Sequence, residues 1–477
     1  MPSQVTPFPK QAGGNTELAA LLERSQRAFR EAPWPSLKVR RQRLKTLKKL
    51  LLANQEALIE AINADYGMRS RNETLLGELM PSVAGINHAL AHLGQWLRPS
   101  RRSLGLHLQP GSAQVQYQPL GVVGIMAPWN YPLFLAMGPL TAALAAGNHV
   151  LLKLSEHTPA TSALLARLIG EHFEPELVSV VEGDAKTAVA FSKLPFDHLL
   201  FTGATAIGHQ VMRAASEHLT PVTLELGGKS PVIVAPDMPL ERAASRILFG
   251  KAFNAGQTCV APDYVLLPRG KARAFAEAML ARFQARYPDW RHNNDYSSII
   301  NGRQYGRLQG YLAQASEAGV AILGAGEGDE LHRRLGLQLL LNPPSHLAVM
   351  QEEIFGPLLP VIEYDDLDEA VAFVQDRPKP LALYLFSHDG KTERRLLGRI
   401  RAGGVCVNET LLHVAVDDLP FGGVGHSGMG QYHGHEGFLT FSHARSLVRK
   451  GRLSSTALVY PPYKGRLLKL LSAWQLR

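Results

Sequence analysis

The spacing of hydrophobic and polar residues divides the chain into a helical first part and an alternating remainder. Residues 15–110 are rich in Leu, Ala, Arg and Glu, and their apolar positions recur every three to four residues, which predicts mostly helix. Residues 113–118 (Ala-Gln-Val-Gln-Tyr-Gln) alternate between apolar and polar side chains, a pattern typical of an exposed strand. From residue 122 onward, short apolar segments take turns with helix-like segments, which predicts a parallel sheet covered by helices.

This alternation forms two series, so the fold class that we expect is α/β with two sheet-containing domains. The first series predicts strands at 122–127, 150–154, 178–182 and 198–202, and helices at 133–146, 160–173 and 208–217. The second series predicts strands at 232–235, 263–268, 320–324, 338–342, 358–363, 382–386 and 404–408, with helices at 240–255, 270–286, 302–318 and 367–375. No Ser- or Gly-rich linker separates the series, so we expect the domains to pack directly against each other.

The composition excludes several classes of protein. With 477 residues, 45% of them hydrophobic, the chain can bury a large core and form two or more domains. It contains only two cysteines, which argues against a disulfide framework and predicts a reducing, cytoplasmic location. The N-terminus lacks a signal core, and Pro, Gly and Asn interrupt the longest apolar region, 120–152, so we expect no transmembrane anchor. No Cys or His spacing is typical of a metal site, and we expect no metal.

The net charge of +9 is concentrated in the C-terminal tail. Eight Lys and Arg residues and no Asp or Glu lie between Arg445 and the end of the chain, whereas the remainder is close to neutral. This localisation and the lack of a recognition motif argue against a nucleic-acid-binding protein. Residues 451–477 combine basic residues with Leu and Trp, so the tail could form an amphipathic helix on a membrane surface or could cover a partner subunit.

Cys259 and Glu225 have the pattern of a nucleophile and a base. Cys259 lies among small residues in Phe-Asn-Ala-Gly-Gln-Thr-Cys-Val-Ala-Pro-Asp-Tyr, and Glu225 stands 34 positions upstream on an expected Gly-Gly turn, Leu-Glu-Leu-Gly-Gly-Lys. Because few thiols are ionised at pH 7, we expect a nearby base or favourable electrostatics to raise the thiolate fraction. A buried structural role, the usual one for a free cysteine, is the interpretation that we keep for Cys406.

Polar residues also follow several predicted strands, where a ligand could bind at the sheet edge. Asn130, in Ala-Pro-Trp-Asn-Tyr-Pro, could donate a hydrogen bond into a site or cap the next helix. Lys153 and Glu156 could reach a ribose or form an ordinary polar turn. Gly203 and Gly208 suit a pyrophosphate at a helix N-terminus, although their spacing is not that of the usual dinucleotide motif. The segment Gln-Glu-Glu-Ile-Phe-Gly-Pro (351–357) could be a binding loop or a charged turn.

Seven motifs in order resemble the aldehyde dehydrogenase superfamily over roughly residues 15–450. They are Pro-Trp-Asn-Tyr-Pro, Lys-x-Ser-Glu, Phe-Thr-Gly, Leu-Glu-Leu-Gly-Gly-Lys, Gly-Gln-Thr-Cys, Glu-Glu-Ile-Phe-Gly-Pro and Pro-Phe-Gly-Gly. Residues 258–264, 419–430, 432–435 and 440–443 are similar to the class 3 branch, and 69–75 and 81–86 to its bacterial coniferyl aldehyde dehydrogenases. Leu154 departs from the family, which usually has proline there.

The resemblance implies a fold of two Rossmann-like parallel-sheet domains plus a bridging β-arm for oligomerisation. The implied NAD(P)-binding domain comprises 1–107 and 120–226, and the catalytic domain 227–425. The bridging strands lie within 108–119 and 426–450, and 451–477 is the basic tail. Class 3 enzymes are typically dimers, so the resemblance implies a homodimer.

The resemblance also assigns roles to residues of this chain. Cys259 would attack the aldehyde, Asn130 and the Cys259 amide would stabilise the oxyanion, and Glu225 would activate the water that cleaves the thioester. The expected cofactor-binding residues are Lys153 and Glu156 on the adenine ribose, Gly203 and Gly208 at the pyrophosphate, Glu353 on the nicotinamide ribose, and Phe355 and Trp129 nearby. A carboxylate at Glu156 repels a 2′-phosphate, which favours NAD while leaving NADP possible.

These features predict NAD(P)-dependent oxidation of a small-molecule aldehyde to the carboxylic acid. Coniferyl aldehyde or a similar aromatic aldehyde leads among the substrates, and medium- or long-chain aliphatic aldehydes come second. A non-catalytic structural or scavenging protein on the same fold is the alternative of a different class, and the presence of Cys259, Glu225 and Asn130 argues against it.

Overall fold

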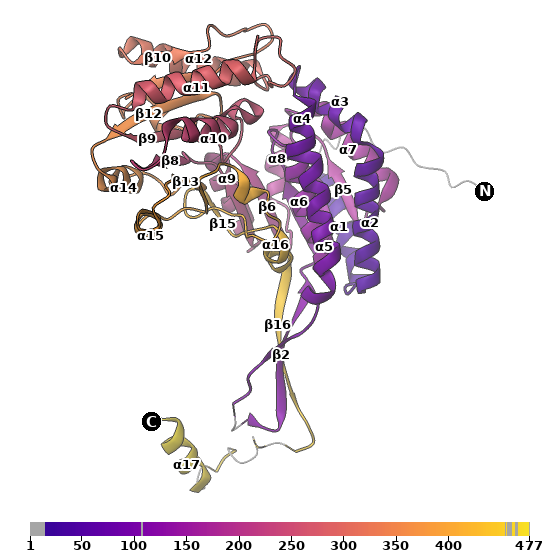
Figure 1. Ribbon diagram of the computed structural model, residues 1–477. Helices are drawn as coiled ribbons and strands as arrows, with labels where there is room; N and C mark the ends of the chain where they lie inside the picture. Colours follow the sequence, from indigo (N-terminus) through magenta and orange to yellow (C-terminus); the bar gives the residue numbers. More distant parts are fainter. Residues whose placement is uncertain (1–14, 106–107, 454, 456–459, 463–465, 477) are drawn as a thin grey trace, which may run out of the picture.

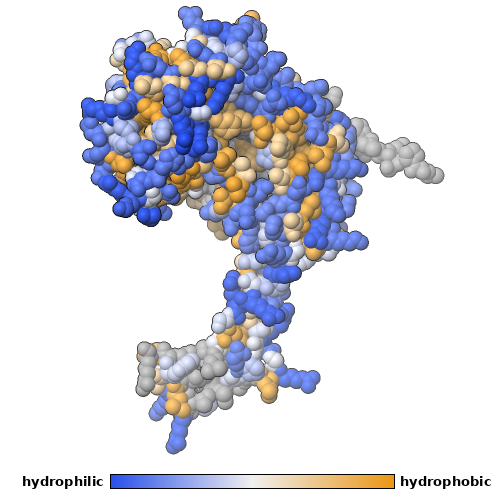
Figure 2. Space-filling model, viewed as in Figure 1, coloured by the Kyte–Doolittle hydropathy of each residue, from blue (hydrophilic) through white to orange (hydrophobic). Residues whose placement is uncertain are grey.

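The protein consists of two sheet-containing lobes and a long arm that projects away from them (Figure 1). The computed structural model describes residues 15–105, 108–453, 455, 460–462 and 466–476. Apolar side chains gather where the two lobes meet, while polar side chains cover most of the outer faces in this view (Figure 2).

The first lobe begins with a helical layer, as predicted. Its helices are α1 (Asn15–Glu31), α2 (Leu37–Ala53), α3 (Gln55–Tyr66), α4 (Arg71–Thr74) and α5 (Met80–Trp96), with a π-helical turn, η1 (Leu75–Leu79), before α5. In α2, the Ser36 hydroxyl caps the helix by accepting from the Val39 amide at 3.3 Å. The leucines of α2 at helical spacing (Leu44, Leu47, Leu50 and Leu51) are fully buried, and α2 packs against α5.

A six-stranded sheet forms the centre of the first lobe, in the order β15-β7-β6-β3-β4-β5. Its strands are β3 (Val122–Met126), β4 (His149–Lys153), β5 (Val178–Val181), β6 (His198–Gly203), β7 (Val222–Leu226) and β15 (Gly428–Met429). All pairs are parallel except β15 with β7. The helices α6 (Phe134–Ala146), α7 (Pro159–His172), α8 (Ala185–Ser192) and α9 (Thr205–Ser216) connect the strands. The chain leaves β3 toward β4 on one side and returns to β6 on the other, which creates a crevice at the carboxyl ends.

The second lobe holds a seven-stranded sheet in the order β10-β11-β12-β9-β8-β13-β14, parallel except for β10. Its strands are β8 (Pro231–Val234), β9 (Tyr264–Pro268), β10 (Ala321–Gly324), β11 (Gln338–Leu341), β12 (Leu358–Tyr364), β13 (Ala382–Phe386) and β14 (Gly404–Val407). Its helices are α10 (Leu240–Ala252), α11 (Ala272–Arg286), α12 (Gly302–Glu317), α13 (Ala348–Gln351), α14 (Leu367–Gln375) and α15 (Gly390–Leu397), with 3-10 turns η3 (Phe253–Gly256) and η4 (Leu412–Val414). The two parallel sheets confirm the predicted α/β fold class.

The arm is a three-stranded antiparallel ribbon in the order β1-β2-β16, made of β1 (Ser100–Arg102), β2 (Gly111–Pro119) and β16 (Ser442–Lys450). The strand predicted at 113–118 is confirmed as part of β2, and its partner β16 lies within the range 426–450 given for the second bridging strand. The arm starts earlier than residue 108, because 100–102 joins it. Residues 426–441 do not belong to the ribbon, since β15 pairs with β7 and α16 (Gly434–Thr440) contacts α5 and α6.

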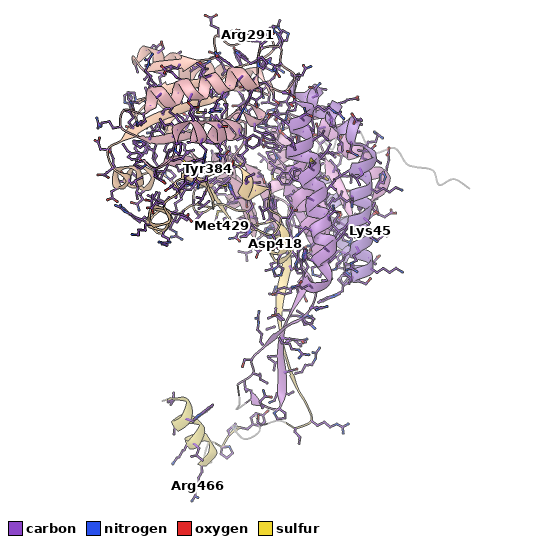
Figure 3. The ribbon with its side chains drawn as sticks, viewed as in Figure 1. Lys45, Arg291, Tyr384, Asp418, Met429 and Arg466 are labelled. Atoms are coloured by element: carbon purple, nitrogen blue, oxygen red, sulfur yellow. The ribbon has the colours of Figure 1, made fainter. Side chains whose placement is uncertain are left out.

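The tail ends in the helix α17 (Arg466–Gln475), which lies beyond the arm, with Arg466 far from Tyr384 in the second sheet (Figures 1 and 3). Leu470 and Trp474 of α17 are exposed. The side chains of Leu467, Leu468 and Leu471, on which the predicted amphipathic face also depends, lie outside the described residues. Among the helices that the structure describes, none is both long and apolar enough to cross a bilayer.

Three predictions of local structure were wrong. The helix predicted at 240–255 ends at Ala252, because Asn254 and Ala255 adopt left-handed backbone angles (φ of 51° and 50°). The helix predicted to open at Gly208 already begins at Thr205. Glu225 lies within the strand β7 and not on a turn, which is formed by the two glycines that follow.

Asn148 joins the first sheet to the base of the arm. Its Oδ1 accepts from the amides of Leu120 (2.7 Å) and Gly121 (3.0 Å), and its Nδ2 donates to the carbonyl of Phe441 at 2.8 Å. The side chain is fully buried, so no water replaces these bonds.

We therefore expect Asn148→Ala to lower the free energy of unfolding by about 3 kcal/mol, because it leaves buried amides and a carbonyl unpaired. Urea unfolding followed by circular dichroism measures the change. The control is Asn87→Ala, which removes an exposed side-chain bond to Lys48 and should change stability by less than about 0.5 kcal/mol. Equal effects of the two substitutions would contradict the role of Asn148 in joining the first sheet to the arm.

Candidate active site

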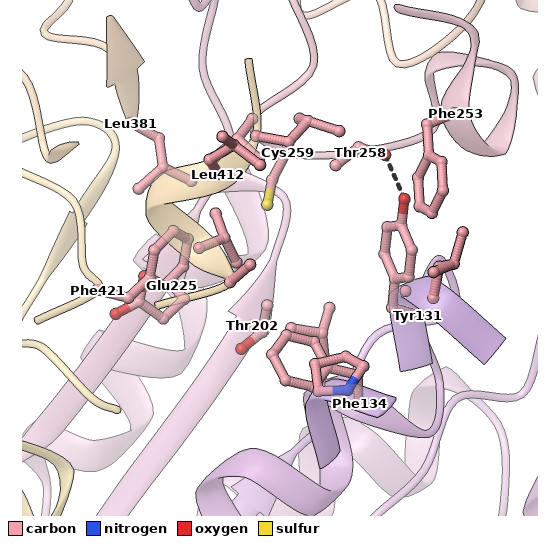
Figure 4. A pocket seen from close by; sticks show the side chains of 18 of the residues that line it. Tyr131, Phe134, Thr202, Glu225, Phe253, Thr258, Cys259, Leu381, Leu412 and Phe421 are labelled. Carbon is pink, nitrogen blue, oxygen red and sulfur yellow. Dashed lines mark hydrogen bonds between the residues drawn. The ribbon is translucent and has the colours of Figure 1, made fainter. Parts of the chain in front are cut away.

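Cys259 lies at the wall between two cavities. It follows the turn η3 on the loop that leads into β9, and its thiol is partly exposed although Thr258 and Val260 on either side are buried. Figure 4 shows the sulfur pointing into the space between Thr202, Phe134 and Leu412. A cysteine in this position is accessible to a small ligand while most of its surroundings exclude water.

The first of the two cavities, the apolar cavity, has a volume of about 270 Å³ (Figure 4). Five aromatic side chains contribute to its wall: Tyr131, Phe134, Phe249, Phe253 and Phe421. Three polar side chains other than the cysteine also line it, namely Thr202, Glu225 and Thr258. The Thr258 hydroxyl is already hydrogen-bonded to the Tyr131 hydroxyl at 2.8 Å. This cavity suits the apolar body of a ligand.

The second, the central cavity, has a volume of about 510 Å³ and is more polar. It is lined by Trp129, Asn130, Gly203, Glu353 and Phe355, together with residues 204–206 at the start of α9. Leu135, Thr202, Glu225, Leu226 and Cys259 line both cavities. The thiol and the Glu225 carboxyl are thus available from either side.

The third, the outer cavity, continues from the central one and has a volume of about 580 Å³. Lys153, Glu156, Gln210 and Arg213 line it, and it shares Trp129 and Gly203 with the central cavity. The structure therefore brings nine of the ten predicted site residues into one connected region. Gly208 is the exception: its amide donates to the Ala204 carbonyl at 3.0 Å inside α9, and a Cβ at this position would lie 2.6 Å from Leu226. This glycine permits close packing of helix on strand and does not line the cavities.

Glu225 is held in the interior by the strand that carries it. It pairs with Gly428 of β15 and Thr202 of β6 in the sheet, and only 2% of the residue is exposed. Neither carboxyl oxygen has a hydrogen-bond partner among the described residues. Burial raises the pKa of the Glu225 carboxyl well above its usual range. An ionised carboxylate here would be a strong base.

The electrostatic surroundings of Cys259 disfavour the thiolate. Burial raises the pKa of the thiol to about 12, and the nearby carboxyls of Glu353 and Glu225 add to the effect. Of the two expected means of raising the thiolate fraction, the surroundings do not supply favourable electrostatics, whereas Glu225 lies in the same cavities as a possible base. In these surroundings the protonated thiol is the favoured form.

Asn130 is buried beside the cysteine loop and does not cap a helix. Its Nδ2 donates to the Gln257 carbonyl at 3.2 Å, which uses one of its two N–H groups. The next helix, α6, is capped instead by Glu78, whose carboxylate accepts from the Leu133 and Phe134 amides at 2.7 and 3.2 Å. The alternative role of Asn130 as a cap is thus wrong, and its second N–H group remains for a ligand.

Lys153 and Glu156 differ in exposure. Lys153 is buried, and its Nζ donates to the carbonyls of Leu154 (2.6 Å) and Gly183 (2.8 Å), while burial lowers the pKa of its ammonium group. Leu154, which stands in place of the family's proline, is buried and supplies one of these acceptors. Glu156 is exposed on the same cavity. A lysine held in place and an open carboxylate can both reach hydroxyl groups of a ligand.

The central and outer cavities fit a dinucleotide. Glu353 is half-buried, its Oε1 atom is buried without a partner among the described residues, and desolvation raises the pKa of the carboxyl to about 8. A Cβ at Gly227 would lie 1.9 Å from the other oxygen, so only glycine allows this approach. The Trp129 and Phe355 rings meet edge to face, with centroids 5.3 Å apart. Residues 204–206 at the start of α9 line the central cavity, and the N-terminus of a helix suits a pyrophosphate.

Several residues that shape the site were not predicted from the sequence. Thr202 lines all three cavities, and its buried hydroxyl has no partner in the described part of the chain. Lys229 forms an ion pair with Asp263 and donates to the carbonyls of Val349 (2.8 Å) and Glu352 (2.9 Å), which fixes the loop that carries Glu353. Thr202, Lys229 and Asp263 all lie in motifs that resemble the family. As polar residues next to candidate site residues, they could have been predicted to shape the site.

Comparisons with known proteins agree with this geometry. The model of the aldehyde dehydrogenase family matches residues 6–447. A probable coniferyl aldehyde dehydrogenase of Pseudomonas aeruginosa is 55% identical over 95% of each chain, and the coniferyl aldehyde dehydrogenase of Pseudomonas sp. strain HR199 is 44% identical over 96% of each. The solved substrate-bound Staphylococcus aureus AldH is 39% identical, with a TM-score of 0.92 over 95% of this chain and 99% of that one. The chain belongs to the aldehyde dehydrogenase family and is an NAD(P)-dependent aldehyde dehydrogenase.

Proposed function

We propose that the protein oxidises an aromatic propenal such as coniferyl aldehyde to the carboxylic acid, with NAD as the preferred cofactor. The observation that carries this proposal is the position of Cys259 at the wall shared by an aromatic-lined apolar cavity and a polar cavity that fits a dinucleotide. The aromatic lining suits a planar ring, because offset and edge-to-face ring contacts are favourable. The relatives named for coniferyl aldehyde support the same substrate.

A medium- or long-chain aliphatic aldehyde is the second candidate. Three apolar residues that line the apolar cavity are also exposed at the surface: Leu76 (57%), Phe249 (41%) and Leu412 (48%). An alkyl chain longer than the cavity would continue over these side chains. This observation indicates that the cavity accepts the alkyl chain of a long aldehyde as well as an aromatic ring.

The reaction begins with the Cys259 thiol and the aldehyde carbon. The sulfur forms a bond to the carbonyl carbon as the thiol proton passes to a base, for which Glu225 is the nearby carboxylate. The oxygen becomes an oxyanion, which accepts hydrogen bonds from the second N–H group of Asn130 and from the Cys259 amide. When bound, NAD(P) supplies the two-electron acceptor that converts this adduct to a thioester.

Hydrolysis of the thioester completes the reaction. After Glu225 has passed the thiol proton to solvent, its carboxylate removes a proton from water, and the water oxygen attacks the acyl carbon. The carbon–sulfur bond then breaks, Glu225 gives the proton taken from water to the leaving sulfur, and the acid is released while the thiol is restored. The same two donors stabilise the oxyanion of this second step. Because the apolar cavity limits the access of bulk water to the thioester, the water that reacts is the one that is hydrogen-bonded to Glu225.

The cofactor would be held by residues of the central and outer cavities. Glu353 would accept from the nicotinamide ribose beside Phe355 and Trp129, the α9 amides near Gly203 would bind the pyrophosphate, and Lys153 and Glu156 would bind the adenine ribose. Gly208 supports this site only by its packing. The Glu156 carboxylate disfavours a 2′-phosphate, whereas Arg213 and Lys193 in the same cavity favour one, so NADP is the second cofactor.

The domains follow the two sheets, with 1–107 and 120–226 binding the cofactor and 227–425 carrying Cys259. We place the protein in the cytoplasm because both cysteines are unpaired. The strand β16 is an edge of the arm, and its Val448 is exposed, which supports a homodimer formed through the arm. We assign the tail to contacts with the partner subunit and keep a membrane surface as the alternative.

The substrate assignment predicts a ranking of initial rates. With coniferyl aldehyde, benzaldehyde and decanal, each with NAD and NADP, we expect the highest kcat/KM for coniferyl aldehyde with NAD, measured by absorbance of the reduced cofactor. A higher value with decanal would favour the aliphatic alternative. No reduced cofactor with any aldehyde would refute the proposed function.

Cys259→Ser should lower kcat by at least about 10³-fold, because an alcohol is a far weaker nucleophile than a thiol at neutral pH. Cys406→Ser is the matched control and should retain wild-type turnover, since Cys406 lies on the edge strand β14 outside the three cavities. Wild-type turnover in Cys259→Ser would show that another residue is the nucleophile.

Glu225→Gln should separate the two halves of the reaction. We expect the steady-state rate to fall by about 10²–10⁴-fold because the water loses its base. The acylated enzyme should then accumulate, and mass spectrometry of the quenched protein should find the acyl mass on the peptide that contains Cys259. An unchanged rate without any adduct is the opposite result and would remove Glu225 from hydrolysis.

The raised thiol pKa predicts the pH dependence of alkylation. Only the thiolate reacts, and a group with a pKa of about 12 stays protonated up to high pH. In the Cys406→Ser background without cofactor, the iodoacetamide rate at Cys259 should therefore rise about tenfold per pH unit from pH 7 to pH 10. Glu353→Gln should speed labelling at a fixed pH. A plateau below pH 9 would contradict the raised pKa.

A further inference from the structure

The segment 69–78 contains three buried charged residues that the proposed mechanism does not use. Arg69, Glu73 and Glu78 are 1%, 5% and 0% exposed, respectively. Charged side chains are almost never buried to this degree unless they are paired or hydrogen-bonded. Each of these three contacts a segment that carries a proposed active-site residue, which indicates a role in placing those segments.

The backbone carbonyl of Asn130 is the acceptor on which these contacts converge. It accepts from Arg69 Nη1 at 3.1 Å and from the Tyr66 hydroxyl at 2.9 Å. It also accepts from Asn254 Nδ2 at 3.1 Å. Three donors from separate elements fix the peptide plane of Asn130, and this plane sets where the side-chain amide points.

Arg69 is linked to the second domain through Tyr131. Its guanidinium lies over the rings of Tyr66 and Tyr131, at 4.9 and 5.1 Å from their centroids, and Glu78 balances its charge at 3.7 Å. Tyr131 in turn is hydrogen-bonded to Thr258, the residue before Cys259. A single cation therefore supports the residues next to the oxyanion donor and, through Tyr131, the residue next to the nucleophile.

The turn before Cys259 is strained and is held by the same segment. Asn254 and Ala255 have φ angles of 51° and 50°, which are unfavourable for residues other than glycine. Glu73 Oε1 accepts from the Asn254 amide at 3.0 Å, and its Oε2 accepts from the Ser297 hydroxyl at 2.5 Å. The Asn254 side chain donates both to Asn130 and to the Gln257 carbonyl at 3.1 Å. These bonds keep the turn in its left-handed conformation.

We propose that Arg69 is a positioning residue, which with Tyr66 and Glu73 holds the Asn130 amide in register with Cys259. This proposal rests on the proposed function, because it assumes that Asn130 stabilises the oxyanion. It assigns a role to the 69–75 motif: the segment aligns two domains at the reacting atoms and touches neither substrate nor cofactor.

The alternative is that Arg69 only stabilises the fold. A second buried arginine, Arg40, provides a matched control for that role. Arg40 is also 1% exposed, and it likewise donates to backbone carbonyls, those of Ala145, Ala146 and Pro35. These acceptors lie at the far end of α6 and in the loop before α2, and Arg40 lines none of the three cavities. Arg40→Lys should therefore cost stability without a specific effect on kcat.

The experiment is a double-mutant cycle between Arg69→Lys and Asn130→Ala, with Arg40→Lys and Cys259→Ser measured beside it. We expect Asn130→Ala to lower kcat by about 10²–10³-fold. Arg69→Lys should lower it by about 10²-fold, since small misplacements of catalytic groups cost this much, with KM for NAD changed less than about threefold. The double variant should be no slower than Asn130→Ala alone, because both changes remove the same interaction.

The outcomes separate the two roles. Losses that multiply in the double variant, or an Arg69→Lys loss no larger than that of Arg40→Lys, would overturn the positioning role. A neutral Asn130→Ala would overturn it as well, because Arg69 would have no donor to act through. Failure of the proposed function appears separately, as turnover retained in Cys259→Ser.

Tyr66→Phe tests the positioning of Asn130 independently, in case Arg69→Lys does not fold. It removes one hydroxyl that donates to the Asn130 carbonyl and keeps the ring under Arg69. We expect kcat to fall about fivefold, the equivalent of one hydrogen bond, with a melting temperature lowered by no more than about 4 °C. This loss should disappear in the Asn130→Ala background. A wild-type kcat in Tyr66→Phe, or a loss that persists without Asn130, would overturn the proposal.

Discussion

The removal of water from one carboxyl and one thiol is the constraint on which this structure depends. Glu225 lies near the carboxyl end of β7, Cys259 lines the same two cavities, and burial shifts both groups toward their neutral forms. Such a pair is costly to build, since neither carboxyl oxygen is compensated by a hydrogen bond among the described residues. The aromatic and aliphatic side chains of the apolar cavity surround the two groups and limit the access of water to them.

The two groups come from different domains, so the boundary between the sheets determines their geometry. The carboxyl ends of β6 and β7 supply Thr202 and Glu225, while the loop into β9 supplies the cysteine. Hydrogen bonds that cross the boundary, such as Asn130 to Gln257 and Tyr131 to Thr258, fix this arrangement. The boundary behaves as part of the site, which explains why buried charges such as Arg69 and Glu73 are found there.

The sequence predicted most strands and helices because buried parallel strands appear as short apolar runs. It failed where a local signal was missing. The strand β7 was not predicted because a charged residue, Glu225, interrupts its leucines. The end of α10 was placed too late because the left-handed residues Asn254 and Ala255 are not glycines. Motifs identified the residues that gather around Cys259. They did not predict the cavities or the raised thiol pKa, because side chains distant in sequence create both. Gly208 was misassigned because spacing alone does not separate a packing glycine from a binding one.

The wall shared by the apolar and central cavities affects how substrate, product and cofactor bind and leave. Apart from five residues, the two compartments have separate linings, so an occupant of one does not obstruct the other. The oxidised organic product can therefore depart while the spent dinucleotide stays behind, or the reverse. An inhibitor that occupies only the apolar cavity would leave most of the lining of the central cavity uncovered.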